Sequence, residues 1–158
     1  MIKIMFVCHG NICRSPMAEF VFKDMVQKMG FADQFLIASS ATSTEEIGNP
    51  VHRGTRKKLA EYGISPDGKC AIQLRRADYD SYDYIIAMDS NNVRNISRII
   101  GHDRDGKISR LLDFANRPGD IADPWYTGNF DDTYNDVREG CVALLKQIID
   151  EKKNELIG

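Results

Sequence analysis

The sequence lacks the features that mark membrane, metal-binding or nucleic-acid-binding proteins. No apolar run approaches the ~20 residues needed to cross a bilayer, and no cationic segment followed by a long apolar run opens the chain. The net charge of −2 leaves no broad basic surface for a polyanion. The four cysteines and three histidines show no zinc-ligand spacing. We therefore expect a cytoplasmic protein that binds neither nucleic acid nor membrane and needs no metal or other cofactor.

Internal repeats, low-complexity tracts and linkers are also missing from the chain. Its 158 residues, of which 42% are hydrophobic, are enough to bury a core without disulfides or metal ions. We expect residues 1–158 to form one domain, and the protein to be a monomer or a weak dimer.

Strand and helix patterns alternate along the chain. Strands are expected at residues 2–7, 35–39, 84–87 and 108–111. Helical patterns follow the first strand, follow Asn49-Pro50, run from 90 to about 100, and cover residues 137–149. This alternation predicts an α/β fold, a single three-layer domain in which a four-stranded parallel sheet has helices on both faces. Ligands of such sheets bind at the carboxyl ends of the strands.

The segment after the first expected strand has the composition of an anion-binding loop. Gly10 and Asn11 tolerate the unusual backbone angles of a tight loop. Ser15-Pro16 is typical of a helix start, with serine as the cap and proline in the first turn. A strand, an inward-facing loop and a helix N-terminus together form a phosphate site. The expected phosphate-binding residues are His9, Gly10, Asn11, Ile12, Cys13, Arg14 and Ser15.

Cys8 and Arg14 enclose this loop and indicate its chemistry. An ordinary thiol is only about 3% thiolate at neutral pH, so a nucleophilic Cys8 needs loop amides, the Ser15 hydroxyl and the Arg14 charge around it. The same donors would bind a phosphoryl group, with the Arg14 fork taking two oxygens at once. The alternative for Cys8 is a small buried hydrophobe at a strand end, which the loop composition disfavours. Cys70 and Arg76 have the same spacing but no glycine, following hydroxyl or preceding strand, so we assign them no function.

Residues 7–19, which read VCHGNICRSPMAE, resemble the signature of the low-molecular-weight protein tyrosine phosphatases. The resemblance continues through residues 39–42, 47–50, 62–64, 82–89 and 123–126, and so spans nearly the whole chain. It implies a protein tyrosine phosphatase that hydrolyses phosphotyrosine in proteins, or small aryl phosphates, through a cysteinyl phosphate and without metal.

The resemblance implies a second catalytic residue in Asp123. A phosphoester breaks when its departing oxygen is protonated, which a carboxylic acid can do. By the resemblance, Asp123 is this acid and later the base that activates water; taken alone, an Asp before a Pro favours a plain turn. Trp125 and Tyr126 beside it suit a flat ring at a pocket mouth, and we expect them at the substrate rim.

The resemblance also assigns supporting residues. Asn11 and Ser15 would hold the loop in shape, assisted by a serine that corresponds to Ser39 or Ser40. Cys13 would be the redox partner of Cys8, forming a reversible disulfide that protects the nucleophile from overoxidation.

Several positions depart from the family pattern. Glu45 stands where many members place an aromatic rim residue, and this acidic wall is expected to disfavour acidic phosphopeptides. Lys69 stands where some members have a histidine that fixes the loop serine, so that support is expected to be absent. His9 replaces a commonly apolar residue and is expected to face solvent. His52 and His102 show no partner spacing and are expected at the surface.

Other functions remain open on the sequence. Arsenate reductases of this fold need a further pair of cysteines, whereas only Cys70 lies in the middle of the chain. Protein arginine phosphatases of this family usually have threonine at the position of Ile12, and the apolar residue favours an aryl phosphate. A non-catalytic phosphate-binding module or a phosphocarrier would not need Asp123.

Overall fold

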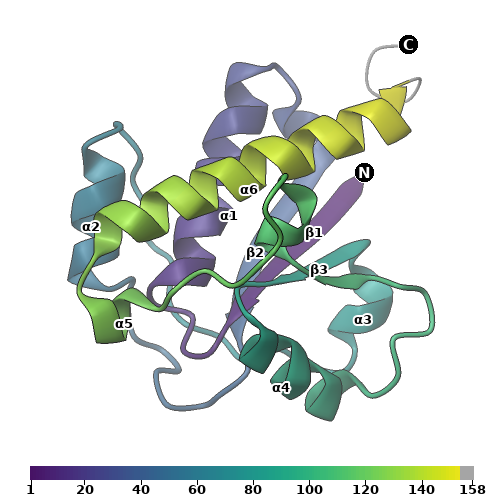
Figure 1. Ribbon diagram of the computed structural model, residues 1–158, viewed down its shortest axis with the longest axis horizontal. Helices are drawn as coiled ribbons and strands as arrows, with labels where there is room; N and C mark the ends of the chain where they lie inside the picture. Colours follow the sequence, from purple (N-terminus) through teal and green to yellow (C-terminus); the bar gives the residue numbers. More distant parts are fainter. Residues whose placement is uncertain (154–158) are drawn as a thin grey trace.

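The computed structural model describes residues 1–153 and contains a parallel sheet with the strand order β2-β1-β3-β4 (Figure 1). The strands are β1 (Ile2–Cys8), β2 (Phe35–Ala41), β3 (Tyr84–Ala87) and β4 (Ile108–Arg110). All three strand pairings are parallel, so the chain must cross a face of the sheet between consecutive strands. The predicted α/β fold with a four-stranded parallel sheet is confirmed.

The central strand β1 is covered on both faces. Ile4 and Phe6 contribute to one hydrophobic cluster, whereas Met5 and Val7 contribute to another. Successive side chains of a strand point to opposite faces, so a strand buried on both sides needs apolar residues at every position. This requirement explains the apolar run from Ile4 to Cys8, where every position is buried.

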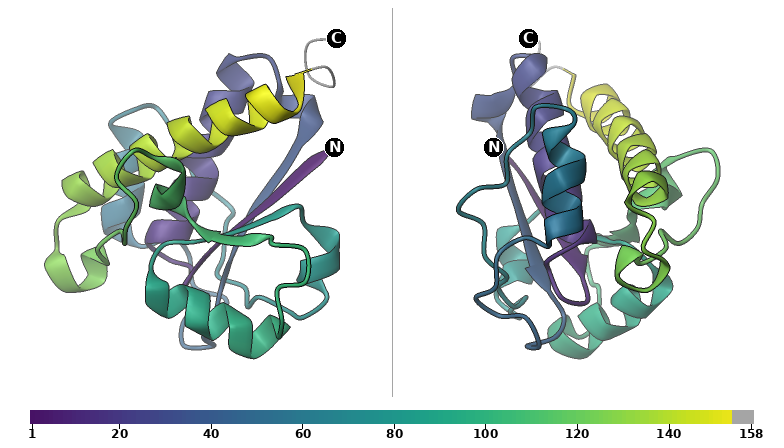
Figure 2. Two further views of the ribbon diagram at one scale, coloured as in Figure 1. Left: turned by 45° about the vertical axis from the view of Figure 1, so that its right-hand side comes forward. Right: turned by 90° about the vertical axis from the view of Figure 1, so that its left-hand side faces the viewer.

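The helices divide between the two faces of the sheet. The face with Ile4 and Phe6 packs against α1 (Arg14–Lys28), α2 (Arg53–Ala60) and α6 (Phe130–Glu151). The other face packs against α3 (Asp78–Ser81) and α4 (Ser90–Ile100). In the left view of Figure 2, α6 crosses the upper part of the molecule and α4 the lower part, with strands between them. The three predicted layers are therefore present.

Three short elements complete the fold. They are the 3-10 helices η1 (Ala32–Gln34) and η2 (Leu111–Phe114) and the single turn α5 (Pro124–Thr127). Leu111 begins η2, so the fourth strand is one residue shorter than predicted. None of the helices described within residues 1–153 combines the length and apolar character that a membrane span requires.

The starts of three helices differ from the prediction. Helix α6 begins at Phe130, seven residues before the apolar repeat that predicted it. Helix α1 begins at Arg14, and its N-cap residue Cys13 makes no side-chain cap hydrogen bond. Ser15 therefore does not cap the helix: it lies inside the first turn, where its buried hydroxyl faces Cys8, while Pro16 occupies the first turn as predicted. Helix α2 begins after His52 rather than at Asn49-Pro50, because the His52 side chain supplies the cap.

The sheet brings the ends of β1 and β3 together at its carboxyl edge. Cys8 is the last residue of β1, and Asp89 follows β3 by two residues. These two strands are hydrogen-bonded neighbours, so the loops that leave them meet. This edge holds the candidate site, as expected for a parallel sheet.

Candidate active site

Asn11 determines the shape of the loop after β1. With a φ of 57°, it is the one non-glycine residue with positive φ in the described chain, and asparagine tolerates this left-handed conformation better than most residues. Its buried Nδ2 donates to Oγ of Ser15 at 2.7 Å and to Oγ of Ser39 at 2.9 Å. Its Oδ1 accepts from the backbone N–H of Ile72 at 3.2 Å. The loop is thereby attached to α1, to β2 and to the segment around residue 72.

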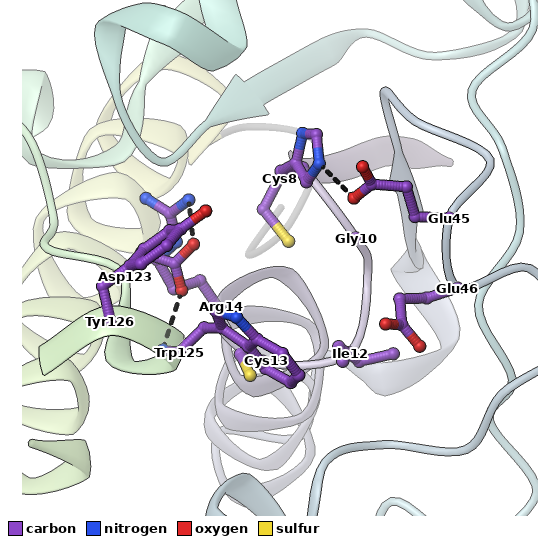
Figure 3. Close-up of a pocket in the computed structure, with 11 residues that line it drawn as sticks. Cys8, Gly10, Ile12, Cys13, Arg14, Glu45, Glu46, Asp123, Trp125 and Tyr126 are labelled. Atoms are coloured by element: carbon purple, nitrogen blue, oxygen red, sulfur yellow. Dashed lines mark hydrogen bonds and ion pairs between the residues drawn. The ribbon is translucent and has the colours of Figure 1, made fainter. Parts of the chain in front are cut away.

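The thiol of Cys8 has two polar groups directed at it. Oγ of Ser15 lies 3.0 Å from Sγ, and the backbone N–H of Asn11 donates to Sγ at 3.3 Å. Cys8 is only 3% exposed, yet it lines the pocket shown in Figure 3. Donors aimed at the sulfur stabilise negative charge on it, so this arrangement is suited to a thiolate.

Arg14 is buried beside Cys8 and held by acceptors from distant parts of the chain. Its Nη1 donates to Oδ2 of Asp89 at 2.7 Å and to the carbonyl oxygen of Ile121 at 2.8 Å, and its Nη2 lies 3.4 Å from Oδ2 of Asp123. Burial by itself lowers the pKa of Arg14, but the nearby Cys8, Asp89 and Asp123 outweigh it and raise the pKa. Within residues 1–153, the acceptors of Arg14 face Nη1 and, at the longer distance, Nη2, and none faces Nε. Nε and Nη2 are therefore the groups that can bind a phosphoryl oxygen.

Asp123 faces the same pocket from the start of α5. Its Oδ1 accepts from the backbone N–H of Trp125 at 3.0 Å and caps this short helix, while its Oδ2 faces Arg14. The carboxyl group is partly exposed and lines the pocket with Cys8. A turn-forming role and a pocket position thus coexist in one residue.

Aromatic and acidic residues form opposite sides of the pocket mouth. Trp125 and Tyr126 are 57% and 83% exposed and lie on the same side as Asp123 (Figure 3). Glu45 and Glu46 lie on the other side, where Oε2 of Glu45 is 2.6 Å from Nε2 of His9. His9 is half exposed, as expected, but it is paired with a carboxylate.

A buried acid supports the loop from behind. Oγ of Ser39 donates to Oε1 of Glu19 at 2.5 Å, and Oε2 of Glu19 accepts from Nζ of Lys23 at 2.5 Å. Nζ of Lys69 donates to the carbonyl oxygen of Ser39 at 2.7 Å and lies 3.9 Å from Glu19. Lys69 therefore does contact this serine, contrary to the expectation that support is absent there, but through the backbone carbonyl; the Ser39 hydroxyl is held by Glu19. Burial lowers the pKa of Lys69, with Glu19 acting in the opposite direction.

The two serines offered as loop supports have different positions. Ser39 contacts both Asn11 and Glu19, whereas Oγ of Ser40 is buried without a hydrogen-bond partner among residues 1–153. Ser39 is therefore the residue in a position to hold the loop. Ser40 contributes its carbonyl oxygen, which lies 3.5 Å from Oγ of Ser15.

Cys13 lies in the same loop as Cys8 but in a different environment. It is buried, and burial together with the neighbouring Cys8 raises the pKa of the Cys13 thiol to about 12. Its carbonyl oxygen accepts from Oγ1 of Thr55 at 3.2 Å, which links the loop to α2. Cys13 is thus a protonated thiol at neutral pH.

The structure brings most of the predicted site residues into one pocket. The residues that line it are Cys8, His9, Gly10, Ile12, Cys13, Arg14, Glu45, Glu46, Asp123, Trp125 and Tyr126. Asn11, Ser15 and Ser39 lie behind the loop instead, so the side chains of Asn11 and Ser15 shape the loop rather than line the pocket.

Sequence reasoning missed Asp89, Glu19 and Glu46 and misplaced His52. Asp89 and Glu19 both fall within the motifs that resemble the family. Asp89 follows an expected strand, which was a signal for a partner of Arg14, and Glu19 follows the phosphate loop, which was a signal for a partner of Ser39. His52 is half-buried and packs on aromatic rings, so it is not a surface residue, whereas His102 is exposed as expected.

No group of three or more His, Cys, Asp or Glu side chains within residues 1–153 is arranged to hold a metal ion. The pocket combines a thiol, a guanidinium, inward-facing donors and a carboxyl group. This set of groups is suited to transferring a phosphoryl group to sulfur and then to water.

Comparison with known proteins agrees with this chemistry. The family model described as low molecular weight phosphotyrosine protein phosphatase matches residues 3–154. The low molecular weight protein-tyrosine-phosphatase YfkJ of Bacillus subtilis is 43% identical over 155 residues, which cover 97% of this chain and 99% of the relative. PtpA of Staphylococcus epidermidis, with the same description, is 41% identical over 150 residues, covering 94% and 95% of the two chains.

Two solved structures are similar along nearly their whole length. The crystal structure of YfkJ has a TM-score of 0.92 and covers 96% of this chain and 97% of its own, at 43% identity. The low molecular weight protein tyrosine phosphatase SP-PTP of Streptococcus pyogenes has a TM-score of 0.86 and covers 98% of both chains, at 45% identity.

Proposed function

This chain belongs to the low molecular weight phosphotyrosine protein phosphatases, and we propose that it hydrolyses phosphotyrosine and other aryl phosphate monoesters through a cysteinyl phosphate on Cys8. The observation that carries the proposal is the convergence on one pocket of two segments: the loop with Cys8 and Arg14, and the turn with Asp123 more than a hundred residues later. The match of the family model to residues 3–154 supports one catalytic domain for residues 1–158.

In the first step, the thiolate of Cys8 attacks phosphorus and the bond from phosphorus to the phenolic oxygen breaks. The departing oxygen takes a proton from the carboxyl group of Asp123, so a neutral phenol leaves. Arg14 and the loop amides bind the oxygens of the phosphoryl group as it transfers, where the fixed donors stabilise its charge. Ser15 and Asn11 stabilise the sulfur anion before attack, because both contact Sγ.

In the second step, the carboxylate of Asp123 takes a proton from a water molecule, whose oxygen attacks phosphorus. The bond from phosphorus to sulfur breaks, and inorganic phosphate and the thiolate of Cys8 are released. Asp123 regains its proton in this step, so acid and thiolate are ready for another cycle. The position of Asp123 at the pocket mouth, opposite Glu45, leaves the approach to phosphorus open to water after the phenol departs.

The test is turnover of p-nitrophenyl phosphate in the presence of a chelator. We expect the wild-type protein to remain active and Cys8→Ser to be inactive with an unchanged thermal midpoint. Asp123→Asn should lose about 10²–10⁴ in rate on phenyl phosphate and less on p-nitrophenyl phosphate, whose leaving group needs less protonation. Loss of wild-type activity in the chelator, or activity of Cys8→Ser, contradicts the mechanism.

The other cysteines do not favour an arsenate reductase. Cys70 is exposed and pairs through its backbone with Pro50, while Cys141 is fully buried in α6. A relay of electrons from Cys8 needs thiols that can reach it, which neither position supports. Ile12 presents an apolar side chain to the pocket, which favours an aryl group over a charged phosphoarginine side chain. Turnover of phosphotyrosine and phosphoarginine side by side tests this preference.

Cys13 is proposed as a redox partner of Cys8. Hydrogen peroxide would oxidise the Cys8 thiolate to a sulfenic acid, and Cys13 would attack that sulfur, releasing water and forming a disulfide. A dithiol reductant would restore both thiols. Because activity requires reduced Cys8, we place the protein in the cytoplasm, where thiols are kept reduced. The expected oligomeric state is a monomer or a weak dimer.

A further inference from the structure

His52 lies between the loop that carries the nucleophile and the turn that carries the acid. Its backbone N–H donates to the carbonyl oxygen of Ile12 at 2.8 Å. Its Nδ1 accepts from the backbone N–H of Gly54 at 2.9 Å, which caps α2. This bond places the proton of the neutral ring on Nε2, since Nδ1 is the acceptor. Backbone and side chain together hold the imidazole next to the phosphate loop.

The ring of His52 contacts two aromatic side chains that flank the acid turn. It stacks on Phe130 of α6, with ring centroids 5.4 Å apart and an interplanar angle of 17°. Trp125 meets it edge-on, at 5.7 Å and 78°. Aromatic pairs at such distances contribute beyond the area that they bury.

The approach of Phe130 to α2 requires a residue without a side chain. A Cβ atom built on Gly54 would lie 2.3 Å from the Phe130 ring, so any larger residue there would push the ring away. Phe130 and the imidazole therefore stack directly over the start of α2. This close packing is a second constraint on where the ring of His52 lies.

The contact with Trp125 bears on Asp123. The backbone N–H of Trp125 donates to Oδ1 of Asp123, so a displacement of Trp125 moves the carboxyl group. Backbone hydrogen bonds hold Ile121 to Met88 and close the turn from Tyr126 and Thr127 to the carbonyl oxygen of Asp123, and Pro124 is buried. The carbonyl oxygen of Ala122 lies 3.4 Å from Oγ1 of Thr133, and Asp123 faces Arg14. The side chain of Trp125 is more than half exposed, and its edge-on contact with the ring of His52 restrains it on the side of the phosphate loop.

We propose that His52 is a positioning residue that holds the segment 123–126 in register with the phosphate loop, so that Asp123 reaches the leaving oxygen. The inference rests on the proposed role of Asp123 as the general acid. His52 itself touches neither sulfur nor substrate and acts through Trp125. Its loss moves the acid while the nucleophile and Arg14 remain in place.

The effect of a displaced acid depends on the leaving group. A phenol of tyrosine type, with a pKa of about 10, must be protonated as it departs, whereas p-nitrophenol leaves more readily as an anion. Because kcat/KM covers the steps up to departure of the phenol, its ratio between p-nitrophenyl phosphate and phenyl phosphate reports the position of the acid.

Two substitutions separate the ring from the cap. His52→Asn keeps a good helix cap and removes the aromatic ring. We expect it to lower kcat/KM about tenfold on phenyl phosphate and no more than about twofold on p-nitrophenyl phosphate, since small misplacements of a catalytic group are costly. His52→Phe keeps the ring and removes the cap; it should lower the thermal midpoint but leave the ratio between the two substrates as in wild type. His102→Asn, at an exposed histidine, is the matched control and should change neither quantity.

A spectroscopic readout is available because the chain contains a single tryptophan. In His52→Asn, the fluorescence of Trp125 should change in intensity and become more easily quenched by iodide than in wild type. In His52→Phe, both changes should be smaller. A merely structural role would lower the thermal midpoint of both variants without changing the leaving-group ratio.

The outcomes also separate this inference from the proposed mechanism. If Asp123→Asn shows a strong leaving-group effect and His52→Asn shows none, the inference about His52 is overturned and the mechanism stands. If Asp123→Asn itself shows no leaving-group effect, the role of Asp123 fails. A leaving-group effect in both, absent from His52→Phe and His102→Asn, supports the inference.

Discussion

Replacing Asp89 with asparagine removes a charge beside Arg14 while keeping the helix cap that the same side chain provides. Oδ2 of Asp89 accepts from Nη1 of Arg14 at 2.7 Å, and Oδ1 accepts from the backbone N–H of Asn92 at 2.7 Å at the start of α4. Asparagine is about as good a cap as aspartate, so the main loss in Asp89→Asn is the ion pair with Arg14. The Arg14 side chain is only 3% exposed and cannot recover this energy from water.

The size of the effect follows from the remaining partners of Arg14. A hydrogen bond to a charged group contributes about 1.5–3 kcal/mol, and breaking a fully buried pair costs about 3–5 kcal/mol. The carbonyl oxygen of Ile121 and the carboxylate of Asp123 still face Arg14, and Asp89 is itself partly exposed, which places the loss near the lower values. We expect Asp89→Asn to lower the free energy of unfolding by about 2 kcal/mol and the thermal midpoint by roughly 4–8 °C.

The loss of activity should exceed the loss of stability. Once Nη1 is no longer fixed, the guanidinium can turn, and Nε and Nη2 no longer meet two phosphoryl oxygens together. We expect kcat/KM on p-nitrophenyl phosphate to fall about 10–100-fold at a temperature where the variant is folded. The matched control is Asp120→Asn, since Asp120 binds Arg110 and Ser90 near the surface and does not contact Arg14. Wild-type kcat/KM in Asp89→Asn would refute the view that Asp89 fixes Arg14.

Three further predictions concern the pocket mouth and the loop cysteines. Phosphotyrosine peptides flanked by lysine or arginine should have higher kcat/KM than those flanked by acidic residues, and Glu45→Gln should reduce the difference; equal values on both peptide sets contradict an acidic wall. Iodoacetate should alkylate Cys8 and spare Cys13, because burial raises the pKa of Cys13 to about 12. Mass spectrometry of a Cys70→Ser background should find the label on Cys8, and inorganic phosphate should prevent this labelling. Equal labelling of Cys13 contradicts the prediction. After brief exposure to peroxide, wild-type activity should return with dithiothreitol while Cys13→Ser stays largely inactive; equal recovery argues against a protective disulfide.

Local sequence patterns were sufficient to predict the fold class and the phosphate loop. The apolar run of β1, the glycine and asparagine after it and the helical pattern beyond act between neighbouring residues, so they can be read in order along the chain. Cys8 and Arg14 belong to the same short segment, and their spacing together with the preceding strand, the glycine and the following serine was enough to identify a candidate nucleophile and its cation. Asp123 was found only through the resemblance to a family, because an Asp before a Pro is common in turns.

The limits of local reading show at Ser15 and His52. A serine before a proline at a helix start is typical of a cap, yet the hydroxyl of Ser15 is turned inward to Cys8 and Asn11. The choice between these roles depends on which atoms lie within reach after folding. His52 has no periodic partner in the sequence, and its contacts with Trp125 and Phe130 come from α5 and α6, more than seventy residues later.

The sequence by itself determined the α/β architecture, the candidate phosphate loop and the family to which they belong, because their signals are short motifs of contiguous residues. Only the tertiary structure decided that Asp89 holds Arg14, that Glu19 and Lys69 hold Ser39, and that an aromatic cluster lies beside the acid. Asp89 is 75 residues from Arg14 along the chain, and the two meet because β3 pairs with β1 in parallel and ends at the same edge. The pairing of strands that are distant in the sequence brings these charges together, and no pattern of adjacent residues predicts that pairing.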